Sequence, residues 1–166
     1  VLRVVPGVPA DGGAGGQQAA DATLADAVEL AAATGLPFWV KGVLRADDAL
    51  LAVDAGAAGV VVSNHGGRQL DGAVATVVAL PEVTAAVAGR AQVLVDGGVR
   101  SGRDVVTALA LGADAVLLAR PVLWALAVGG ADGVRDLLTG LREEVVEVLR
   151  LCGAPDAASV GRDLLT

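Results

Sequence analysis

Residues 59–71 run Gly-Val-Val-Val-Ser-Asn-His-Gly-Gly-Arg-Gln-Leu-Asp. The stretch begins with an unbroken apolar segment and passes directly into polar side chains and a pair of glycines. A short continuous apolar segment is typical of a strand that is buried on both faces, and such strands occur in parallel sheets covered by helices. The stretch therefore predicts an α/β fold in which a parallel strand ends in a polar loop.

Outward from this stretch, the same unit of strand, turn and helix repeats along the chain. Strands are predicted at residues 38–41, 59–63, 92–96 and 115–118. Helices are predicted at residues 23–34, 47–55, 75–88 with an interruption at Pro81, 102–111, from Val122 onwards, and 133–151. This alternation indicates a parallel α/β sheet, which belongs either to a doubly wound sheet or to a TIM (β/α)₈ barrel.

Composition narrows the class of protein. Hydrophobic residues make up 54% of the 166 residues, and the formal net charge is −7. The acidic balance argues against nucleic acid and against an anionic membrane surface as partners. The single cysteine, Cys152, cannot form an intrachain disulfide, which favours a reducing compartment. Residues 1–20 lack the apolar core of a signal peptide and no apolar run reaches transmembrane length, so a cytoplasmic protein is expected.

Polar side chains gather where the predicted strands end. The first, third and fourth strands close on Lys41, Asp96 and Arg120, and the second is followed by Ser63 and His65. The carboxyl ends of parallel strands share one face, where ligands bind in α/β folds. A lysine at a strand end ordinarily reaches into solvent, but Lys41 is the only lysine beside eleven arginines, which favours a specific role.

The loop after the third predicted strand has the features of an anion site. Gly97 and Gly98 allow the backbone to approach a ligand closely, so that N–H groups can face a phosphate. The helix that begins near Ser101 adds the positive end of its dipole, and Arg100 and Arg120 can clamp the same anion. The alternative is a tight turn with surface arginines, but Arg120 at the next strand end favours a phosphate.

His65 and Arg68 form a second candidate pair. A histidine can act as a base near neutral pH, and an arginine three residues later can bind a carboxylate through two parallel hydrogen bonds. Lys41 can place a positive charge beside an electron-accepting ring and stabilise the anion formed on reduction. The alternatives are a structural histidine and an exposed loop arginine, and the strand-end position favours a functional pair. No metal site is predicted.

Residues 62–71 are similar to the active-site signature of the FMN-dependent 2-hydroxy-acid dehydrogenases, the family of glycolate oxidase, lactate oxidase and mandelate dehydrogenase. The match is long and has no gap. Further segments that resemble the family occur in order and with the expected spacing at residues 40–42, 96–102, 110–113 and 120–121. The resemblance covers roughly residues 23–153.

The resemblance implies FMN as the cofactor and a role for each candidate residue. Lys41 would lie near N1 and O2 of the flavin, with Ser63 close to the same ring. His65 would be the active-site base, and Arg68 would bind the carboxylate of the substrate. Asp96 would bond the ribityl chain of the flavin.

The resemblance also implies a grip on the phosphate of FMN, made by Arg100, Arg120 and backbone N–H groups around Gly97 and Gly98. The chain departs from the family at Ala119, where glycine usually precedes the arginine that ends the last strand. The additional methyl group is expected to crowd the phosphate and lower its affinity.

The architecture implied by the resemblance is incomplete. Residues 23–166 would supply about the last four βα units of a TIM (β/α)₈ barrel, and residues 1–22 would be the remnant of a flexible active-site loop. Such a half-barrel exposes the inner face of its sheet and two strand edges. It is therefore expected to pair with a complementary N-terminal half or with itself as a homo-oligomer.

The implied reaction is the oxidation of a small 2-hydroxy acid to the 2-keto acid, with reduced FMN reoxidised by oxygen or another acceptor. The alternative is a non-catalytic flavin- or phosphate-binding fragment that needs the missing half for activity. A relative of IMP dehydrogenase is the third alternative. That chemistry needs a nucleophilic cysteine on an active-site loop, whereas Cys152 stands at the end of the last predicted helix.

Overall fold

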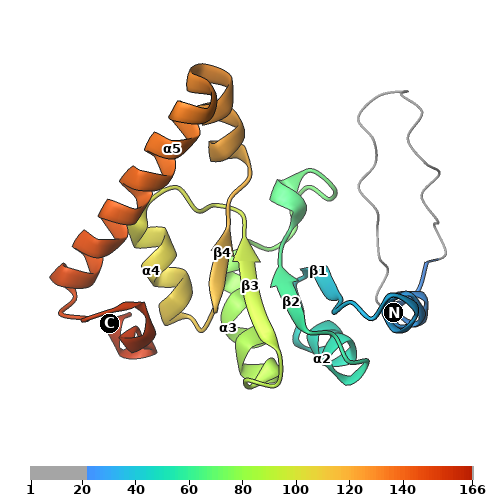
Figure 1. The fold of residues 1–166 in the computed structure, drawn as a ribbon. Helices are drawn as coiled ribbons and strands as arrows, with labels where there is room; N and C mark the ends of the chain where they lie inside the picture. Colours follow the sequence, from blue (N-terminus) through green and yellow to red (C-terminus); the bar gives the residue numbers. More distant parts are fainter. Residues whose placement is uncertain (1–21, 166) are drawn as a thin grey trace.

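The computed structural model describes residues 22–165, in which four parallel strands form one sheet. The strands are β1 (Trp39–Val43), β2 (Gly59–Val62), β3 (Gln92–Asp96) and β4 (Ala115–Leu117). Helices α2 (Ala46–Asp54), α3 (Thr76–Val87) and α4 (Gly102–Ala110) connect them, with α1 (Leu24–Thr34) before and α5 (Arg120–Leu151) after the sheet (Figure 1). The predicted parallel α/β fold is confirmed. The predicted loop segment at residues 1–22 lies, apart from Ala22, outside the described residues.

The order of the strands separates the two alternatives for the sheet. Each strand pairs in parallel with the next strand along the chain, giving the order β1-β2-β3-β4. A doubly wound sheet reverses its strand order at a switch point, whereas a barrel adds its strands in sequence. Because the described sheet has no reversal, its order favours the barrel.

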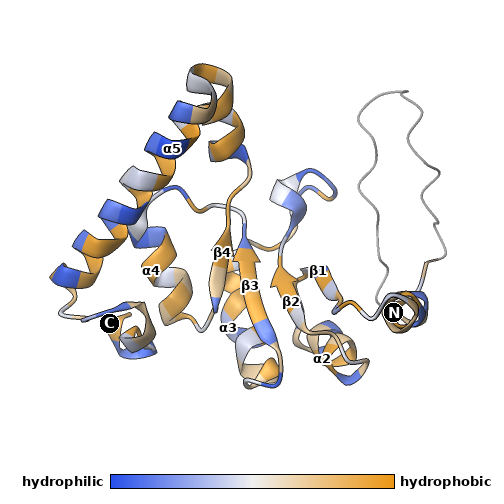
Figure 2. Cartoon of the chain, in the orientation of Figure 1, coloured by the Kyte–Doolittle hydropathy of each residue, from blue (hydrophilic) through white to orange (hydrophobic). Residues whose placement is uncertain are grey.

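The core lies between the sheet and helices α2 to α4. Val40, Val60 and Val93 are register partners on neighbouring strands, and they are buried together with Leu80 and Val83 of α3. Figure 2 shows the strands as predominantly hydrophobic. Burial of a valine or leucine side chain contributes about 1.5–3 kcal/mol. This core fixes the strands and, with them, the loops that follow their carboxyl ends.

Strand β1 differs from its prediction. The sequence placed Lys41 at the end of the strand, but β1 continues to Val43. The pairing register shifts between Lys41 and Val43, which leaves Gly42 as an extra residue with a φ of +103°. Glycine adopts this conformation without strain, so it is suited to such a bulge. Lys41 is therefore held inside a paired strand.

Two helices also differ from their predictions. Helix α3 runs through Pro81 without a break, although proline lacks an N–H group, because Leu80 and Val83 on either side are fully buried. After β4 the helical span Arg120–Leu151 contains the two predicted helices, separated by a kink at Gly130, but the first of them begins at Arg120, which the sequence had placed at the end of the strand.

Helix α5 is interrupted at Gly130, which has non-helical angles (φ +59°, ψ −146°). Figure 1 shows the chain doubling back at this point, so that the second part of α5 runs alongside α4. We call residues 120–129 the short arm and residues 131–151 the long arm. The arms approach closely, since a Cβ atom on Gly133 would lie 2.5 Å from the carbonyl oxygen of Ala125.

Short 3₁₀ turns complete the described chain at His65–Gly67, Ala157–Ser159 and Arg162–Leu164. Cys152 is a free, exposed cysteine after α5. Among residues 22–165, no helix combines the length and the hydropathy that a membrane span requires.

Candidate functional site

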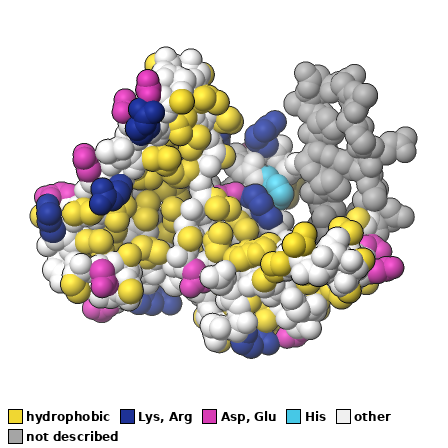
Figure 3. Space-filling model, viewed as in Figure 1, with side chains coloured by type: hydrophobic (Ala, Val, Ile, Leu, Met, Phe, Trp, Pro, Cys, Tyr) yellow, Lys and Arg dark blue, Asp and Glu magenta, His cyan; other side chains and the backbone are white. Residues whose placement is uncertain are grey.

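A cleft of about 740 Å³ lies at the carboxyl ends of the strands. Its walls come from β1 and from the loops after β2, β3 and β4. Every candidate site residue except Ser63 lines it, namely Lys41, His65, Arg68, Asp96, Gly97, Gly98, Arg100, Ala119 and Arg120. In the space-filling view, lysine and arginine side chains lie beside the histidine in a hollow of the surface (Figure 3). The structure thus brings together residues that are far apart in the sequence.

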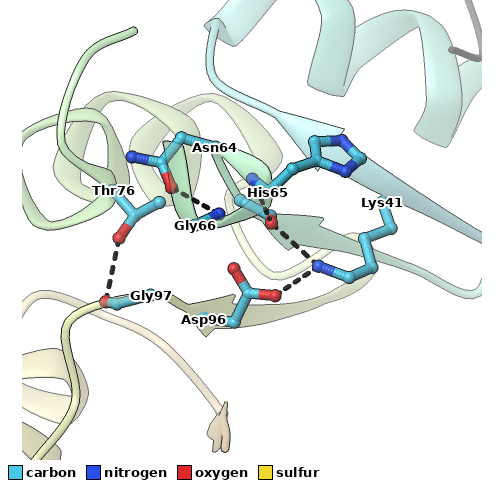
Figure 4. Close-up of polar contacts among 8 residues, drawn as sticks. Lys41, Asn64, His65, Gly66, Thr76, Asp96 and Gly97 are labelled. Carbon is cyan, nitrogen blue, oxygen red and sulfur yellow. Dashed lines mark hydrogen bonds and ion pairs between the residues drawn. The ribbon is translucent and has the colours of Figure 1, made fainter. Parts of the chain in front are cut away.

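Ser63 lies beneath the cleft instead of lining it. Its side chain is fully buried, and its Oγ accepts a hydrogen bond from Lys41 Nζ at 2.8 Å and another from the backbone N–H of His65 at 3.1 Å. Lys41 Nζ also forms an ion pair with Asp96 Oδ2 (Figure 4). One buried hydroxyl therefore connects the lysine of β1 to the turn that carries His65.

Asp96 has one carboxylate oxygen without a partner. Oδ2 pairs with Lys41, whereas Oδ1 is buried and has no hydrogen-bond partner among the described residues. An unsatisfied buried acceptor costs about 1–3 kcal/mol, and more when it is charged. Because Asp96 also lines the cleft, a hydroxyl donor on a bound ligand would satisfy this oxygen.

His65 is held in an unusual backbone conformation. Its φ is +56°, a value that few residues other than glycine adopt. The turn is held by Asn64, whose Oδ1 accepts from the N–H of Gly66 at 3.0 Å and whose Nδ2 donates to the carbonyl of Val74. The imidazole lies against the bulge of β1, because a Cβ atom on Gly42 would lie 2.5 Å from His65 Nε2. The bulge therefore makes room for the ring.

Two arginines, from the loop after β3 and from the start of α5, also line the cleft. Arg100 Nη1 donates to the carbonyl of Val99 at 2.7 Å, and the guanidinium of Arg100 lies 5.4 Å from the ring centroid of Trp124. Arg120 Nη2 is 3.4 Å from the carbonyl oxygen of Gly66. Both guanidinium groups face the same cleft as the glycine loop, which is the arrangement needed to hold an anion.

The start of α4 is already occupied by carboxylates. Asp104 Oδ2 accepts from the backbone N–H groups of Arg100 and Ser101, each at 2.9 Å. Glu144 Oε2, from the long arm of α5, accepts from the N–H of Gly102 at 2.7 Å. Two carboxylates therefore already lie at the start of α4, and the support of an anion by this helix end stays a prediction.

The N-terminus of α5, unlike that of α4, is not capped by a side chain of its N-cap residue. Its N-cap residue, Ala119, provides no side-chain hydrogen bond to the first turn, and both Ala119 and Arg120 line the cleft. The φ of Ala119 is −123°, so this position does not lie in the left-handed region that favours glycine, and the methyl group is expected to act through the space it takes in the cleft. N–H groups at the start of a helix attract anions.

Asp104 should stabilise the fold in a pH-dependent way. Burial opposes its charged form, but hydrogen bonds from Arg100 and Ser101 outweigh this and lower the pKa of Asp104. A lowered pKa stabilises the folded state above the unfolded pKa, and this stability is lost as the pH falls below about 4.

We expect Asp104→Ala to lower the free energy of unfolding by about 1 kcal/mol at pH 7, and the difference from the wild type to shrink near pH 3. Urea unfolding at both pH values measures this. Asp132→Ala, which removes an exposed ion pair with Arg135, is the control and should have little effect. An Asp104→Ala effect equally large at pH 3 would contradict the assignment.

Sequence reasoning missed several residues that shape the site. Gly42 accommodates the imidazole, Asn64 holds the turn, and Glu144 accepts a hydrogen bond from the N–H of Gly102 at the start of α4. Gly42 fell just after the strand predicted at residues 38–41, so the sequence did not mark it as a glycine within a strand, which would have indicated a bulge.

Comparison with known proteins gives the family. The model of the family described as FMN-dependent dehydrogenase matches residues 9–166. The chain is 55% identical to 4-hydroxymandelate oxidase of Amycolatopsis orientalis over 143 residues, which are 86% of this chain and 40% of that protein. It is 53% identical to L-lactate oxidase of Nostoc sp. over 130 residues, covering 78% of this chain and 36% of that protein.

Solved structures agree with the sequence comparison. A mandelate oxidase with a monooxide FMN adduct superposes with a TM-score of 0.83 at 55% identity, covering 86% of this chain and 46% of that chain. A mandelate oxidase with (S)-4-hydroxymandelic acid has the same TM-score and is covered over 40% of its length. The chain thus spans less than half the length of these relatives. With the family model matching almost the whole chain, this protein belongs to the FMN-dependent dehydrogenase family.

Proposed function

We propose that this chain binds FMN in the cleft and takes part in the oxidation of a small 2-hydroxy acid to the 2-keto acid. The convergence of Lys41, His65 and Arg68 with the anion-binding arginines in one cleft carries this proposal. The names of the relatives, 4-hydroxymandelate oxidase and L-lactate oxidase, support the substrate class.

The residues of the cleft fit FMN at each of its parts. The unpaired Oδ1 of Asp96 suits a ribityl hydroxyl, and Arg100, Arg120 and the open end of α5 suit the phosphate. Lys41, which is 46% exposed in its side chain, would supply positive charge to the flavin ring. When bound, FMN supplies a two-electron acceptor for the substrate.

The substrate needs two further groups, which the loop after β2 provides. We assign the carboxylate of the 2-hydroxy acid to Arg68, whose guanidinium can hold it through two parallel hydrogen bonds. We assign His65 as the base that accepts a proton from the substrate as two electrons leave it. The substrate loses two protons and two electrons in total and becomes the 2-keto acid, and oxygen or another acceptor finally takes the electrons.

We also propose that the sheet is half of a (β/α)₈ barrel. Its strands follow in sequence without a reversal, and the face away from the helices carries half-exposed hydrophobic side chains such as Trp39 and Leu117. Figure 3 shows hydrophobic side chains gathered on the viewed face. A complementary N-terminal half or a second copy of the chain would cover this face and the two edge strands.

One observation favours a second candidate function, that of a flavin-binding fragment without activity of its own. Within residues 22–165 no carboxylate pairs with the imidazole of His65. A base of this kind is ordinarily oriented by a third group. The arginines that would bind the phosphate of FMN do not depend on a carboxylate partner for His65. The chain could therefore bind FMN without such a partner.

Product analysis tests the proposed function. The purified chain, loaded with FMN, is mixed with L-lactate, glycolate or mandelate in air, and the 2-keto acid is quantified. We expect a 2-keto acid from at least one of them in an amount exceeding the bound FMN. Bound FMN without product would favour the second candidate, and no bound FMN would contradict both.

The Gly42 bulge gives a sharper prediction for the same chemistry. Gly42→Ala would place a methyl group 2.5 Å from His65 Nε2 at a φ of +103°, so the ring must move. A displacement of about 1 Å can slow a reaction by about 10²-fold, and we expect flavin reduction to slow to this extent with FMN affinity retained. Gly35→Ala is the matched control, because Gly35 also has a positive φ but nothing within 4 Å. Equal rates in the two variants would contradict the account.

A further inference from the structure

The guanidinium of Arg100 is held from two sides by different parts of the chain. Nη1 donates to the carbonyl of Val99 in its own loop, and the ring of Trp124 lies beneath the guanidinium at 5.4 Å to the centroid. Trp124 belongs to the short arm of α5. In the described part of the chain, the other guanidinium N–H groups of Arg100 have no protein acceptor.

Helix α5 holds the loop between β3 and α4 with both of its arms. The short arm supplies Trp124 under Arg100, and the long arm supplies Glu144 to the N–H of Gly102. The two arms can do this because α5 doubles back at Gly130 (Figure 1). The loop that carries the glycine pair and Arg100 is therefore fixed by α5 before any ligand arrives.

The exposure of Trp124 indicates what its ring does. Trp124 is 56% exposed, so the ring does not serve chiefly as core packing. A tryptophan face attracts a guanidinium cation, and an arginine side chain that is fixed in advance loses less conformational freedom when it binds an anion.

We propose that Trp124 is a positioning residue for the phosphate of FMN and acts through Arg100. This inference rests on the proposed binding of FMN in the cleft. The ring of Trp124 and the carbonyl of Val99 fix the guanidinium at the cleft wall, which leaves its free N–H groups for the phosphate oxygens. Trp124 contacts Arg100 and does not itself line the cleft, so we expect its effect to be confined to ligands that carry the phosphate.

Riboflavin makes this distinction measurable, because it has the ring and the ribityl chain of FMN but no phosphate. We expect Trp124→Leu to weaken FMN binding by about two- to fivefold and to leave riboflavin binding unchanged, as measured by titration of flavin fluorescence. Trp124→Phe keeps an aromatic face and should recover part of the loss. If Trp124 had a purely structural role, Trp124→Leu would weaken the binding of FMN and of riboflavin by the same factor. That result would overturn the proposal.

A second comparison keeps the test decisive if Trp124→Leu also disturbs the fold. In an Arg100→Met background, adding Trp124→Leu should cause no further loss of FMN affinity. If Trp124→Leu lowered FMN affinity as much in this background as in the wild type, the proposal would be overturned.

The wild-type chain tests the proposed function separately from this inference. A wild-type chain that does not prefer FMN to riboflavin contradicts the phosphate grip itself and the inference with it. A normal preference that Trp124→Leu leaves unchanged contradicts the inference alone.

Discussion

His65→Asn is expected to slow reduction of bound flavin by a 2-hydroxy acid by about 10²–10⁴-fold, the range for loss of a general base, without weakening FMN binding. Asparagine removes the imidazole but tolerates the positive φ of +56° at this position better than most residues. The turn formed by Ser63 and Asn64 should therefore persist. His65→Ala should also abolish reduction and spare FMN binding, with some added backbone strain.

The measurement is the anaerobic decay of the visible flavin absorbance after mixing with substrate. Dissociation constants for FMN, measured on the same samples, show whether the cofactor site is intact. Reduction at the wild-type rate in His65→Asn would mean that another group accepts the proton, and the assignment of the base would be wrong.

Arg68→Met is expected to weaken substrate binding and slow turnover together. Each charged hydrogen bond to the substrate carboxylate is worth about 1.5–3 kcal/mol, so loss of the guanidinium should cost at least about tenfold in kcat/KM. Arg68→Lys keeps the charge but not the paired donors, and should fall between the wild type and Arg68→Met.

Arg135→Met controls for the loss of a positive charge elsewhere, because Arg135 is exposed on the long arm of α5, where it pairs with Asp132. Steady-state kinetics over a range of substrate concentrations measure all three variants. If Arg68→Met changed kcat/KM no more than Arg135→Met, the carboxylate would have to bind elsewhere.

Much of the fold was predictable because it depends on local patterns. Continuous apolar segments located the four strands. The extension of β1 past Lys41 depends on the bulge at Gly42, which pairing with β2 creates. The passage of α3 through Pro81 depends on burial of its neighbours, a tertiary effect that overrides local preference.

The sequence predicted which residues form the site, but it did not predict which of them contact one another. Strand-end positions placed Lys41, His65 and Asp96 at one cleft, because the carboxyl ends of parallel strands share a face. The hydrogen bonds of Ser63 and the contact of Trp124 with Arg100 join segments that no local pattern relates. Glu144 reaches Gly102 across 42 residues of sequence, so its role follows only from the way α5 doubles back.

The most direct test of the account is a visible absorbance spectrum of the purified chain after FMN addition and desalting, followed by anaerobic addition of a 2-hydroxy acid such as L-lactate or mandelate. We expect flavin to be retained and its absorbance to bleach when the acid is added. Retained flavin that does not bleach would contradict the assigned roles of His65 and Arg68 in this chain. A chain that retains no flavin would contradict the central claim that this cleft binds FMN.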